Sequence, residues 1–375
     1  MKTEFNSVTL SNDLKKKIKG KVLFDEFSRG RYSTDASLYQ IKPIGVVLPK
    51  DQFDVLNIIE YSQKNSIPLL ARGGGSSQCG QTVGECIVLD YSKYQNKILE
   101  FNAKEKFVWV EPGIVLDQLN EYLKPHGLWF PVDVSTSSRA TIGGMTGNNS
   151  CGSRSLYYGN MVNNVLAVES ILDDGSIHTF ENIDKNYLSK TNDQNRKFQI
   201  IKKCIDIREQ VENEINEHWP KTQRRVGGYN IDLINPDGFN SSNILVGSEG
   251  TLSLFNKIKL KLSEIPKKKI LGVCYFEKFH EAMTLTREMV KLKPTTVELM
   301  DKNLLDLAKE IPIYADGIKK YVIGDPKAVL MVEFIDNDLN LINKKIKDLE
   351  NLVKSQNKNN NLSLIHISEP TRLWH

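Results

Sequence analysis

The stretch Arg72-Gly-Gly-Gly-Ser-Ser-Gln-Cys-Gly-Gln81 decides how this chain is interpreted, because side-chain packing cannot explain four glycines so close together. Glycine permits positive φ and lets backbone N–H groups converge on an anion. Apolar runs at Pro68 to Ala71 and Cys86 to Leu89 predict strands on both sides of this loop. The loop therefore predicts a phosphate cradle, with a plain glycine-rich turn as the alternative for one such loop alone.

Two familiar phosphate-binding patterns do not account for this loop. Gly75 to Thr82 nearly matches GxxxxGK[ST], but Gln81 stands in place of the lysine and a strand follows instead of a helix. No GxGxxG occurs at the first βα turn, so the Rossmann fingerprint is also missing. A different kind of nucleotide site is indicated.

Two further glycine tracts follow along the chain. Thr141-Ile-Gly-Gly-Met-Thr-Gly-Asn-Asn-Ser-Cys-Gly152 again combines glycines with small hydrogen-bonding residues, and two cradles suggest one long ligand. Val246-Gly-Ser-Glu-Gly-Thr-Leu252 precedes an alternating strand at Phe255 to Leu262, and by itself it is better interpreted as a simple turn.

The remaining pattern predicts an α+β protein. Before Lys269, apolar periodicity and turn residues predict a strand at 44–48 and a helix at 51–63. They also predict hairpins at 98–111 and 165–180 and helices at 115–123 and 196–218. From Lys269 the predicted order is a strand at 270–276, a helix at 279–292, strands at 295–300 and 328–335, and a helix at 339–353. This is a ferredoxin-like order without its last strand, and a boundary is expected near Ile265 to Lys269.

Composition narrows the class of protein. With 375 residues, two domains are expected at about 150 residues each. The net charge of +4 comes without a basic stripe, so nucleic acid is not an expected partner, whereas a small acidic substrate suits the surface. Five cysteines without CxxC spacing predict neither a disulfide framework nor a metal site. No run approaches the ~18 apolar residues of a membrane span, so a cytoplasmic location is expected, with peripheral attachment at the inner membrane face left open.

The sequence of the last residues indicates that they are not native to the protein. Leu362 to Arg372 is identical to the translated read-through of a common transposon-based sequencing adapter. We therefore expect residues 362–375 to be a non-native tail and the preceding domain to be incomplete.

The three glycine tracts, in this order, resemble the FAD-contacting segments of FAD-linked oxidases with a vanillyl-alcohol-oxidase (PCMH-type) FAD-binding domain. Within that family the chain is most similar to the group of D-lactate, D-2-hydroxyglutarate and glycolate dehydrogenases. The resemblance begins near Tyr32-Ser-Thr-Asp35 and runs to about Met300-Asp301. It implies a lead-in at 1–40, an FAD-binding domain of two α/β subdomains at 41–265 and a partial ferredoxin-like substrate domain at 266–361. The Asn-Asn-Ser-Cys-Gly run is similar to members fused to an iron–sulfur domain.

The resemblance also implies a set of site residues. Cofactor contacts are expected from Arg72, Gly73, Gly74, Gly75, Ser76, Ser77, Gly80, Gln81, Ser135, Thr141, Gly143, Gly144, Asn149, Gly152, Glu249, Gly250 and Ile258. Ser76 stands where some relatives carry a histidine that binds FAD covalently, so a noncovalent flavin is expected. Substrate contacts are expected from Arg224, Arg225, Tyr229 and Asn230, because a guanidinium can donate two parallel bonds to a carboxylate.

The implied activity is FAD-dependent oxidation of a D-2-hydroxy acid, with electrons passed to a quinone, a cytochrome or an iron–sulfur acceptor. An oxygen-using alcohol oxidase of the same fold and a non-catalytic flavin-binding module are the alternatives. In the resembled enzymes the catalytic base is a histidine late in the substrate domain. None of His126, His178, His218 and His280 matches that position, so the base is expected beyond this sequence and no metal ligand is assigned.

Overall fold

The computed structural model describes residues 6–190, 195–222, 224–356 and 362–367. The chain divides into two compact units. The first consists of Met1–Cys151 and Asn160–Ser263, and the second of Gly152–Gly159 and Glu264–His375. The chain leaves the first unit for the last time after Ser263. The short excursion of residues 152–159 into the second unit was not expected.

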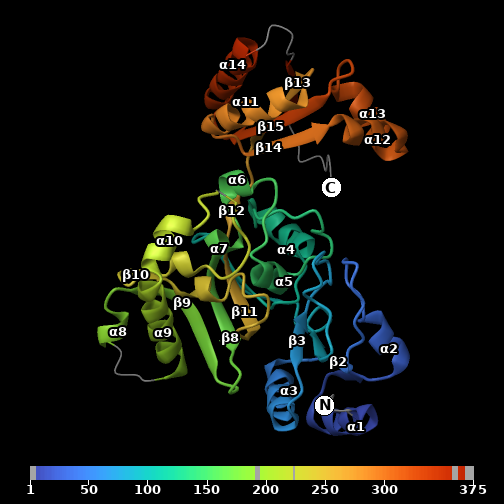
Figure 1. Ribbon diagram of the computed structural model, residues 1–375, viewed down its shortest axis with the longest axis vertical. Helices are drawn as coiled ribbons and strands as arrows, with labels where there is room; N and C mark the ends of the chain where they lie inside the picture. Colours follow the sequence, from blue (N-terminus) through green and yellow to red (C-terminus); the bar gives the residue numbers. More distant parts are fainter. Residues whose placement is uncertain (1–5, 191–194, 223, 357–361, 368–375) are drawn as a thin grey trace. The chain divides into compact units, whose positions relative to one another are not determined.

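The first unit begins with a four-stranded sheet in the order β1–β2–β4–β3, whose strands span Lys21–Leu23, Gly45–Leu48, Ile87–Asp90 and Leu69–Arg72. Strands β2, β4 and β3 run parallel, so a crossover helix, α3 (Gln52–Asn65), joins β2 to β3. The Asp51 carboxylate caps α3 by accepting from the backbone N–H groups of Phe53 and Asp54. Ile58 of α3 packs in the same core as Leu14 of α1 (Ser7–Lys17). The glycine loop begins where β3 ends (Figure 1).

A six-stranded antiparallel sheet, in the order β10–β9–β8–β11–β6–β5, forms the rest of the first unit. Its strands span Ile98–Asn102 (β5), Phe107–Val110 (β6), Val165–Ile171 (β8), Ile177–Asp184 (β9), Gly238–Asn240 (β10) and Leu254–Lys261 (β11). The two expected hairpins are β5–β6 and β8–β9. Both the sheet and α4 (Leu116–Leu123) bury apolar residues in one core, which includes Val108, Leu119 and Phe180.

The expected single helix at Arg196 to His218 is two helices, α9 (Arg196–Gln210) and α10 (Glu212–His218). The break lies at Val211, whose φ of −108° and ψ of 17° leave the helical region. Ile205 and Ile215 are nevertheless both buried, so one non-helical residue leaves the apolar spacing nearly unchanged. Periodicity alone could not reveal the break.

Short elements complete the first unit and the segment 152–159. They are α2 (Glu26–Arg31), η1 (Lys124–His126), β7 (Leu128–Trp129), α5 (Ile142–Asn148), α6 (Ser155–Tyr158), α7 (Met161–Asn164), α8 (Tyr187–Lys190), η2 (Ile231–Leu233), η3 (Ser241–Ile244) and the boundary strand β12 (Ser263–Glu264).

The second unit is an antiparallel sheet in the order β14–β15–β13–β16. The strands span Thr296–Asp301 (β14), Ala328–Asp336 (β15), Lys268–Phe276 (β13) and Leu362–Ile367 (β16). Strand β13 alternates between two cores: Ile270 and Cys274 pack with α11 (Phe279–Lys291) and α14 (Leu339–Gln356), whereas Val273 and Tyr275 face the other core. A strand buried on both faces explains why its sequence is almost continuously apolar.

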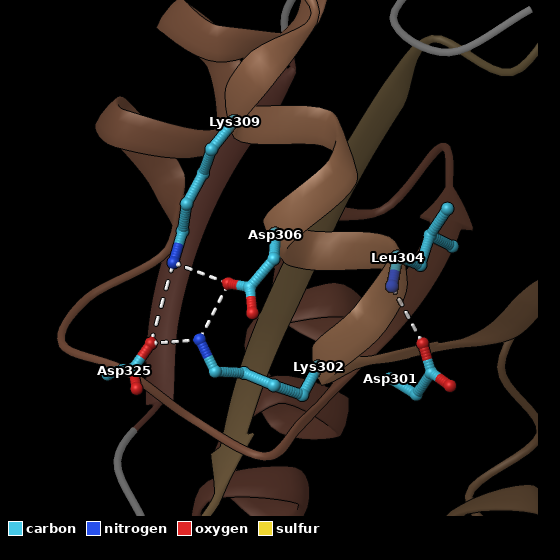
Figure 2. A network of polar contacts seen from close by, with 6 residues as sticks. All are labelled: Asp301, Lys302, Leu304, Asp306, Lys309 and Asp325. Carbon is cyan, nitrogen blue, oxygen red and sulfur yellow. Dashed lines mark hydrogen bonds and ion pairs between the residues drawn. The ribbon is translucent and has the colours of Figure 1, made fainter.

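Helices α12 (Lys302–Glu310) and α13 (Pro312–Tyr321) supply that other core through Leu305 and Ile318. They lie between the expected strands 295–300 and 328–335, and the sequence interpretation had not assigned them. Figure 2 shows how α12 is tied to the loop before β15: the Lys302 and Lys309 ammonium groups both contact the carboxylates of Asp306 and Asp325.

Strand β16 occupies the position of the last strand in a ferredoxin-like order. It pairs antiparallel with β13 from Lys269↔Ile367 to Cys274↔Leu362. The expected three strands are thereby extended to four by residues that read as adapter-derived. Pairing at an open edge depends mainly on backbone groups, so a short β-prone segment of any origin can supply it.

Candidate functional site

A cleft in the first unit brings together segments that are far apart in the sequence. It consists of an outer part of ≈ 350 Å³ and an inner cavity of ≈ 90 Å³, and the two share lining residues such as Gly73, Thr141 and Glu249. An outer part of this size falls in the range of small-molecule sites. The predicted cofactor residues that line one or both parts are Arg72, Gly73, Gly74, Gly75, Ser76, Ser77, Gln81, Ser135, Thr141, Gly143, Gly144, Glu249 and Gly250.

The loop after β3 offers backbone donors to the cleft. The N–H groups of Gly74, Gly75, Ser76 and Ser77 donate to no other residue within the described ranges. Gly75 has a φ of +63°, a left-handed conformation that glycine adopts without strain. Consecutive N–H groups without a protein acceptor, in a turn containing a left-handed residue, form a favourable site for an anion such as a phosphate.

Arg72 holds this loop in place through backbone carbonyls. Its guanidinium donates to the carbonyl oxygens of Thr34 at 2.8 Å, Thr82 at 3.0 Å and Tyr32 at 3.3 Å. The Tyr32 ring lies 5.2 Å from the guanidinium carbon. Although Arg72 lines the inner cavity, these contacts make it chiefly an anchor of the loop.

The first two glycine tracts approach each other at backbone distance. A Cβ atom at Gly73 would lie 1.9 Å from Thr141 Oγ1, and one at Gly74 would lie 2.2 Å from the Arg139 carbonyl oxygen. Both separations are far below van der Waals contact. These glycines are therefore required for packing between the tracts as well as for access to a ligand.

Glu249 links all three tracts. Its Oε1 accepts a hydrogen bond from Asn148 Nδ2 at 2.9 Å and a longer one from Gln81 Nε2 at 3.5 Å. Gln81 Oε1 in turn accepts from the Ser77 hydroxyl. Burial raises the pKa of Glu249, while the two amide donors oppose that shift. Its φ of +51° is unusual for a residue with a Cβ. Residues in such rarely populated backbone conformations cluster at functional sites.

The four residues expected to bind substrate are not equivalent. Arg224 is exposed and lines the outer cleft, and its Nε donates to Cys151 Sγ at 2.7 Å. Arg225 forms an ion pair with Asp232 at 2.5 Å and packs on Trp219. Both contacts occupy the Arg225 guanidinium.

Tyr229 and Asn230 lie outside the residues that line the cleft. The Tyr229 hydroxyl contacts Thr251 Oγ1 at 2.8 Å. Asn230 is buried and donates to the Val246 carbonyl at 2.7 Å, which fixes the start of the third tract.

Four other predicted cofactor residues do not line the cleft. Gly80 adopts a φ of +80° beside Tyr39, and Ile258 is fully buried in the middle of β11. Asn149 is also fully buried, and its Oδ1 accepts from the Val162 N–H. Gly152 belongs to the second unit. These residues shape the surrounding backbone.

The inner cavity also contains residues that the sequence interpretation did not select. Tyr91, Pro112, Ser253 and Phe255 line it, and all four lie at or within two residues of a strand end. Nothing in their local sequence marks them, because their proximity depends on how the two sheets pack. Cys151, which lines the outer cleft, did lie within the second tract.

The cleft suits a long, partly anionic ligand. Its outer part offers N–H donors and Arg224, whereas its inner part combines apolar walls with neutral hydroxyl groups. Within the described ranges no group of three or more potential metal ligands is found. The N–H donors and Arg224 of the outer part fit a nucleotide cofactor with a phosphate near residues 74–77.

Comparison with known proteins identifies the cofactor class. The family described as FAD binding domain matches residues 43–181, and the family described as FAD linked oxidases, C-terminal domain, matches residues 265–374. The chain belongs to the FAD-linked oxidases. The first match contains two of the three glycine tracts that line the cleft, so this FAD-linked oxidase carries its FAD-binding domain in the first unit.

Several curated proteins are similar to this oxidase over part of their length. It is 33% identical over 347 residues to D-2-hydroxyglutarate dehydrogenase of Haemophilus influenzae, covering 88% of this chain and 33% of that protein. It is 26% identical over 345 residues to glycolate oxidase subunit GlcD of Bacillus subtilis, covering 90% and 61%. A D-lactate dehydrogenase of Archaeoglobus fulgidus is 29% identical over 269 residues, covering 71% and 49%. The chain thus spans about a third of the length of the D-2-hydroxyglutarate dehydrogenase.

A solved structure supports the fold. An alkyldihydroxyacetonephosphate synthase superimposes with a TM-score of 0.69 at 16% identity, covering 100% of this chain and 63% of the synthase. At this identity the likeness concerns architecture alone. It agrees with the expected α+β arrangement of an FAD-binding domain followed by a ferredoxin-like domain.

Proposed function

We propose that this FAD-linked oxidase takes part in the oxidation of a D-2-hydroxy acid, with electrons passing to a quinone, a cytochrome or an iron–sulfur acceptor. The observation that carries the proposal is the cleft formed by three glycine tracts, two of which lie inside the matched FAD binding domain. The substrate class rests on relatives named for D-2-hydroxyglutarate, D-lactate and glycolate. Because the chain spans only part of those proteins, the complete activity is proposed for the full-length protein.

The cofactor is proposed to bind noncovalently, with its pyrophosphate on the N–H groups of residues 74–77. Ser76 lines the cleft there and carries a hydroxyl in place of a ring nitrogen. When bound, the flavin supplies a hydride acceptor for the α-carbon of the substrate. Glu249 accepts hydrogen bonds from the other two tracts and is proposed to hold the three tracts together around the cofactor.

Arg224 is proposed to bind the substrate carboxylate. Its Nε contacts Cys151, but its two terminal nitrogens have no hydrogen-bond partner among the residues described. A guanidinium edge that is exposed in the cleft can donate two parallel bonds to a carboxylate. Arg225 is not proposed for this role, since it is paired with Asp232.

The base that removes the hydroxyl proton is proposed to lie outside the described residues. None of His126, His178, His218 and His280 lines the cleft. His126 packs on Phe101, and His218 lies near Glu214. The present chain is therefore proposed to bind FAD with little or no turnover by itself.

The full-length protein tests this function through anaerobic reduction of its flavin. D-lactate, glycolate and D-2-hydroxyglutarate are added separately, and L-lactate serves as the matched control. The proposal predicts that a D-isomer bleaches the flavin absorbance and that L-lactate does not. Flavin that no hydroxy acid reduces would favour the non-catalytic flavin-binding module, and rapid oxygen consumption would favour the oxidase.

Substitution of Arg224 tests the substrate site in the same full-length protein. Loss of a hydrogen-bonded charge partner predicts a rise in KM for the hydroxy acid of roughly ten-fold or more for Arg224→Gln, and a smaller rise for Arg224→Lys. Lys221→Gln removes one positive charge from the same exposed segment and is expected to leave KM unchanged. An unchanged KM in Arg224→Gln would remove Arg224 from the substrate site.

For location we propose the cytoplasm, with peripheral attachment at the inner membrane face as the alternative. Among the residues that the structure describes, no helix is both long and apolar enough to span a bilayer. Cell fractionation with an antibody to the native protein separates the two, because peripheral attachment predicts a membrane fraction that high salt releases.

A further inference from the structure

A separate cavity of ≈ 380 Å³ lies in the first unit, between the junction of α9 with α10 and residues 232–236. It shares no lining residue with either part of the cleft described above. The helix break at Val211 lies beside it, so that Arg208 in the last turn of α9 and Glu212 in the first turn of α10 line the same space. A cavity of this volume falls in the range of small-molecule sites.

Arg208 is in an unusual environment for a largely buried guanidinium group. Its side chain is 15% exposed, yet it forms no hydrogen bond within the described ranges. Its Nη1 lies 3.8 Å from Glu212 Oε1, which is longer than a hydrogen bond. A guanidinium has five N–H donors, and buried polar groups normally have partners. Arg208 can therefore donate to an anionic group that enters the cavity, such as a carboxylate.

Asp232 supplies the opposite charge at the same cavity. Its Oδ2 accepts from the Arg225 guanidinium at 2.5 Å, whereas its Oδ1 has no hydrogen-bond partner among the residues described. Glu212 adds a second carboxylate, which is exposed. An ammonium group has three donors and can bond to two carboxylates at once. Because the cavity presents a cation and a pair of anions, it matches a ligand that carries both charges.

The formal charge of the lining narrows the class of ligand. Arg208 is outnumbered by the carboxylates of Glu209, Glu212 and Asp232, which gives the lining a net charge of −2. This charge opposes a dicarboxylate such as 2-hydroxyglutarate and favours a ligand with an additional positive charge. Ile234 also lines the cavity and offers an apolar surface to an aliphatic chain. A basic α-amino acid has the carboxylate, the ammonium, the chain and the additional charge.

We propose that this cavity binds a basic α-amino acid, lysine or arginine, with its α-carboxylate on Arg208 and its α-ammonium on Asp232 and Glu212. The side-chain cation of the ligand offsets the remaining negative charge of the lining. The inference does not depend on the proposed use of FAD, because the two cavities are lined by different residues.

Isothermal titration calorimetry of this chain tests the site. L-lysine and L-arginine are expected to bind at one molecule per chain. Cadaverine lacks the carboxylate and Nα-acetyl-lysine lacks the α-ammonium, so each is expected to bind roughly ten-fold more weakly or worse than L-lysine. L-glutamate is expected not to bind, because its second carboxylate meets a negative lining. Absence of saturable binding by both basic amino acids, or cadaverine binding as tightly as L-lysine, overturns the proposal.

Titration in the presence of FAD shows which cavity the amino acid occupies. The Kd for L-lysine is expected to be the same with and without FAD. Displacement of L-lysine by FAD would place it in the cleft and overturn the proposal. A chain that binds L-lysine but no FAD would instead contradict the proposed function and leave this inference standing.

Matched variants assign the binding to the named residues. Arg208→Gln is expected to weaken L-lysine binding about ten-fold or more, whereas Lys203→Gln removes a positive charge from the exposed face of α9 outside the cavity and leaves the Kd unchanged. Circular dichroism verifies that the Arg208 variant is folded.

Glu212→Gln provides an independent test at an exposed side chain, where the fold is not at risk. It is expected to raise the Kd for L-lysine about five-fold. Glu217→Gln, on the same helix but outside the cavity, is the control and is expected to have no effect. An unchanged Kd in Glu212→Gln, or in folded Arg208→Gln, overturns the proposal.

Discussion

Glu249 combines three unusual properties at one residue: a left-handed backbone, a half-buried carboxylate and contacts to two other glycine tracts. Because burial raises its pKa above the ordinary value of 4.5, the folded protein holds this proton more tightly than the unfolded chain does. Its contribution to stability is therefore greatest at low pH and declines as pH rises from about 4.5 through the raised pKa.

Glu249→Gln is expected to abolish this pH dependence while preserving the bond from Asn148. The free energy of unfolding of the variant, relative to wild type, should rise with pH by no more than about 1 kcal/mol, because the carboxylate is only half buried. Urea unfolding of both proteins between pH 4 and pH 7 measures the difference. A constant difference across that range would show that the carboxyl ionises freely in the folded state.

Gly73 is predicted to be intolerant of even a methyl group. Gly73→Ala places a Cβ 1.9 Å from Thr141 Oγ1, so the two tracts must separate, at a cost of about 1–3 kcal/mol. Gly227→Ala is the matched control, since its Cβ meets nothing within 4 Å. Chemical denaturation compares the two. Equal stability would mean that the approach of the tracts does not contribute to the fold.

At the level of single residues, the sequence was informative about glycines and much less so about their neighbours. The glycine loops stand out because few other residues adopt their backbone conformations. Tyr91 and Ser253 carry no local signal, because their positions at the cavity arise from packing between strands β4 and β11 that lie far apart in the chain. Arg224 and Arg225 are adjacent in sequence, and only the structure separates the cleft residue from the ion-paired one.

At the level of elements, periodicity predicted the strands and helices that bury one regular face. Strands β5, β6, β8 and β9 follow the expected hairpins, since alternation and turn residues are local properties. The break at Val211 and the helices α12 and α13 escaped prediction. A break that leaves the apolar face in register is invisible to periodicity, and α12 and α13 are stabilised by the second face of a sheet that only the fold reveals.

The ion pairs between α12 and the loop before β15 lead to a prediction at the level of elements. Lys302→Met removes the ammonium that joins Asp306 and Asp325, so the loop before β15 should be held less tightly (Figure 2). Because these groups lie at the surface and are partly exposed, the loss of stability is expected to be small and to vanish at high salt. Thermal unfolding at low and high ionic strength measures it, with Lys278→Met as the control at another exposed ion pair. A loss that persists in high salt would indicate a packing contribution of the lysine side chain instead.

At the level of the whole molecule, the order of glycine tracts predicted the family, and the matched domains confirm it. The origin of residues 362–375 stays a prediction. Strand β16 adds an edge to β13, but backbone pairing does not depend on where the segment came from. Sequencing the gene from genomic DNA decides the matter: a different sequence after Asn361 is expected, and an identical one would make β16 part of the native sheet.

The most direct measurement of the central claim is the cofactor content of this chain. The purified protein is reconstituted with FAD, freed of excess ligand, and its visible spectrum is recorded before and after denaturation and filtration. The account predicts a bound flavin spectrum with about one FAD per chain, and release of all FAD into the filtrate because no covalent bond holds it. A folded protein that retains no flavin would contradict the assignment of the cleft as an FAD site.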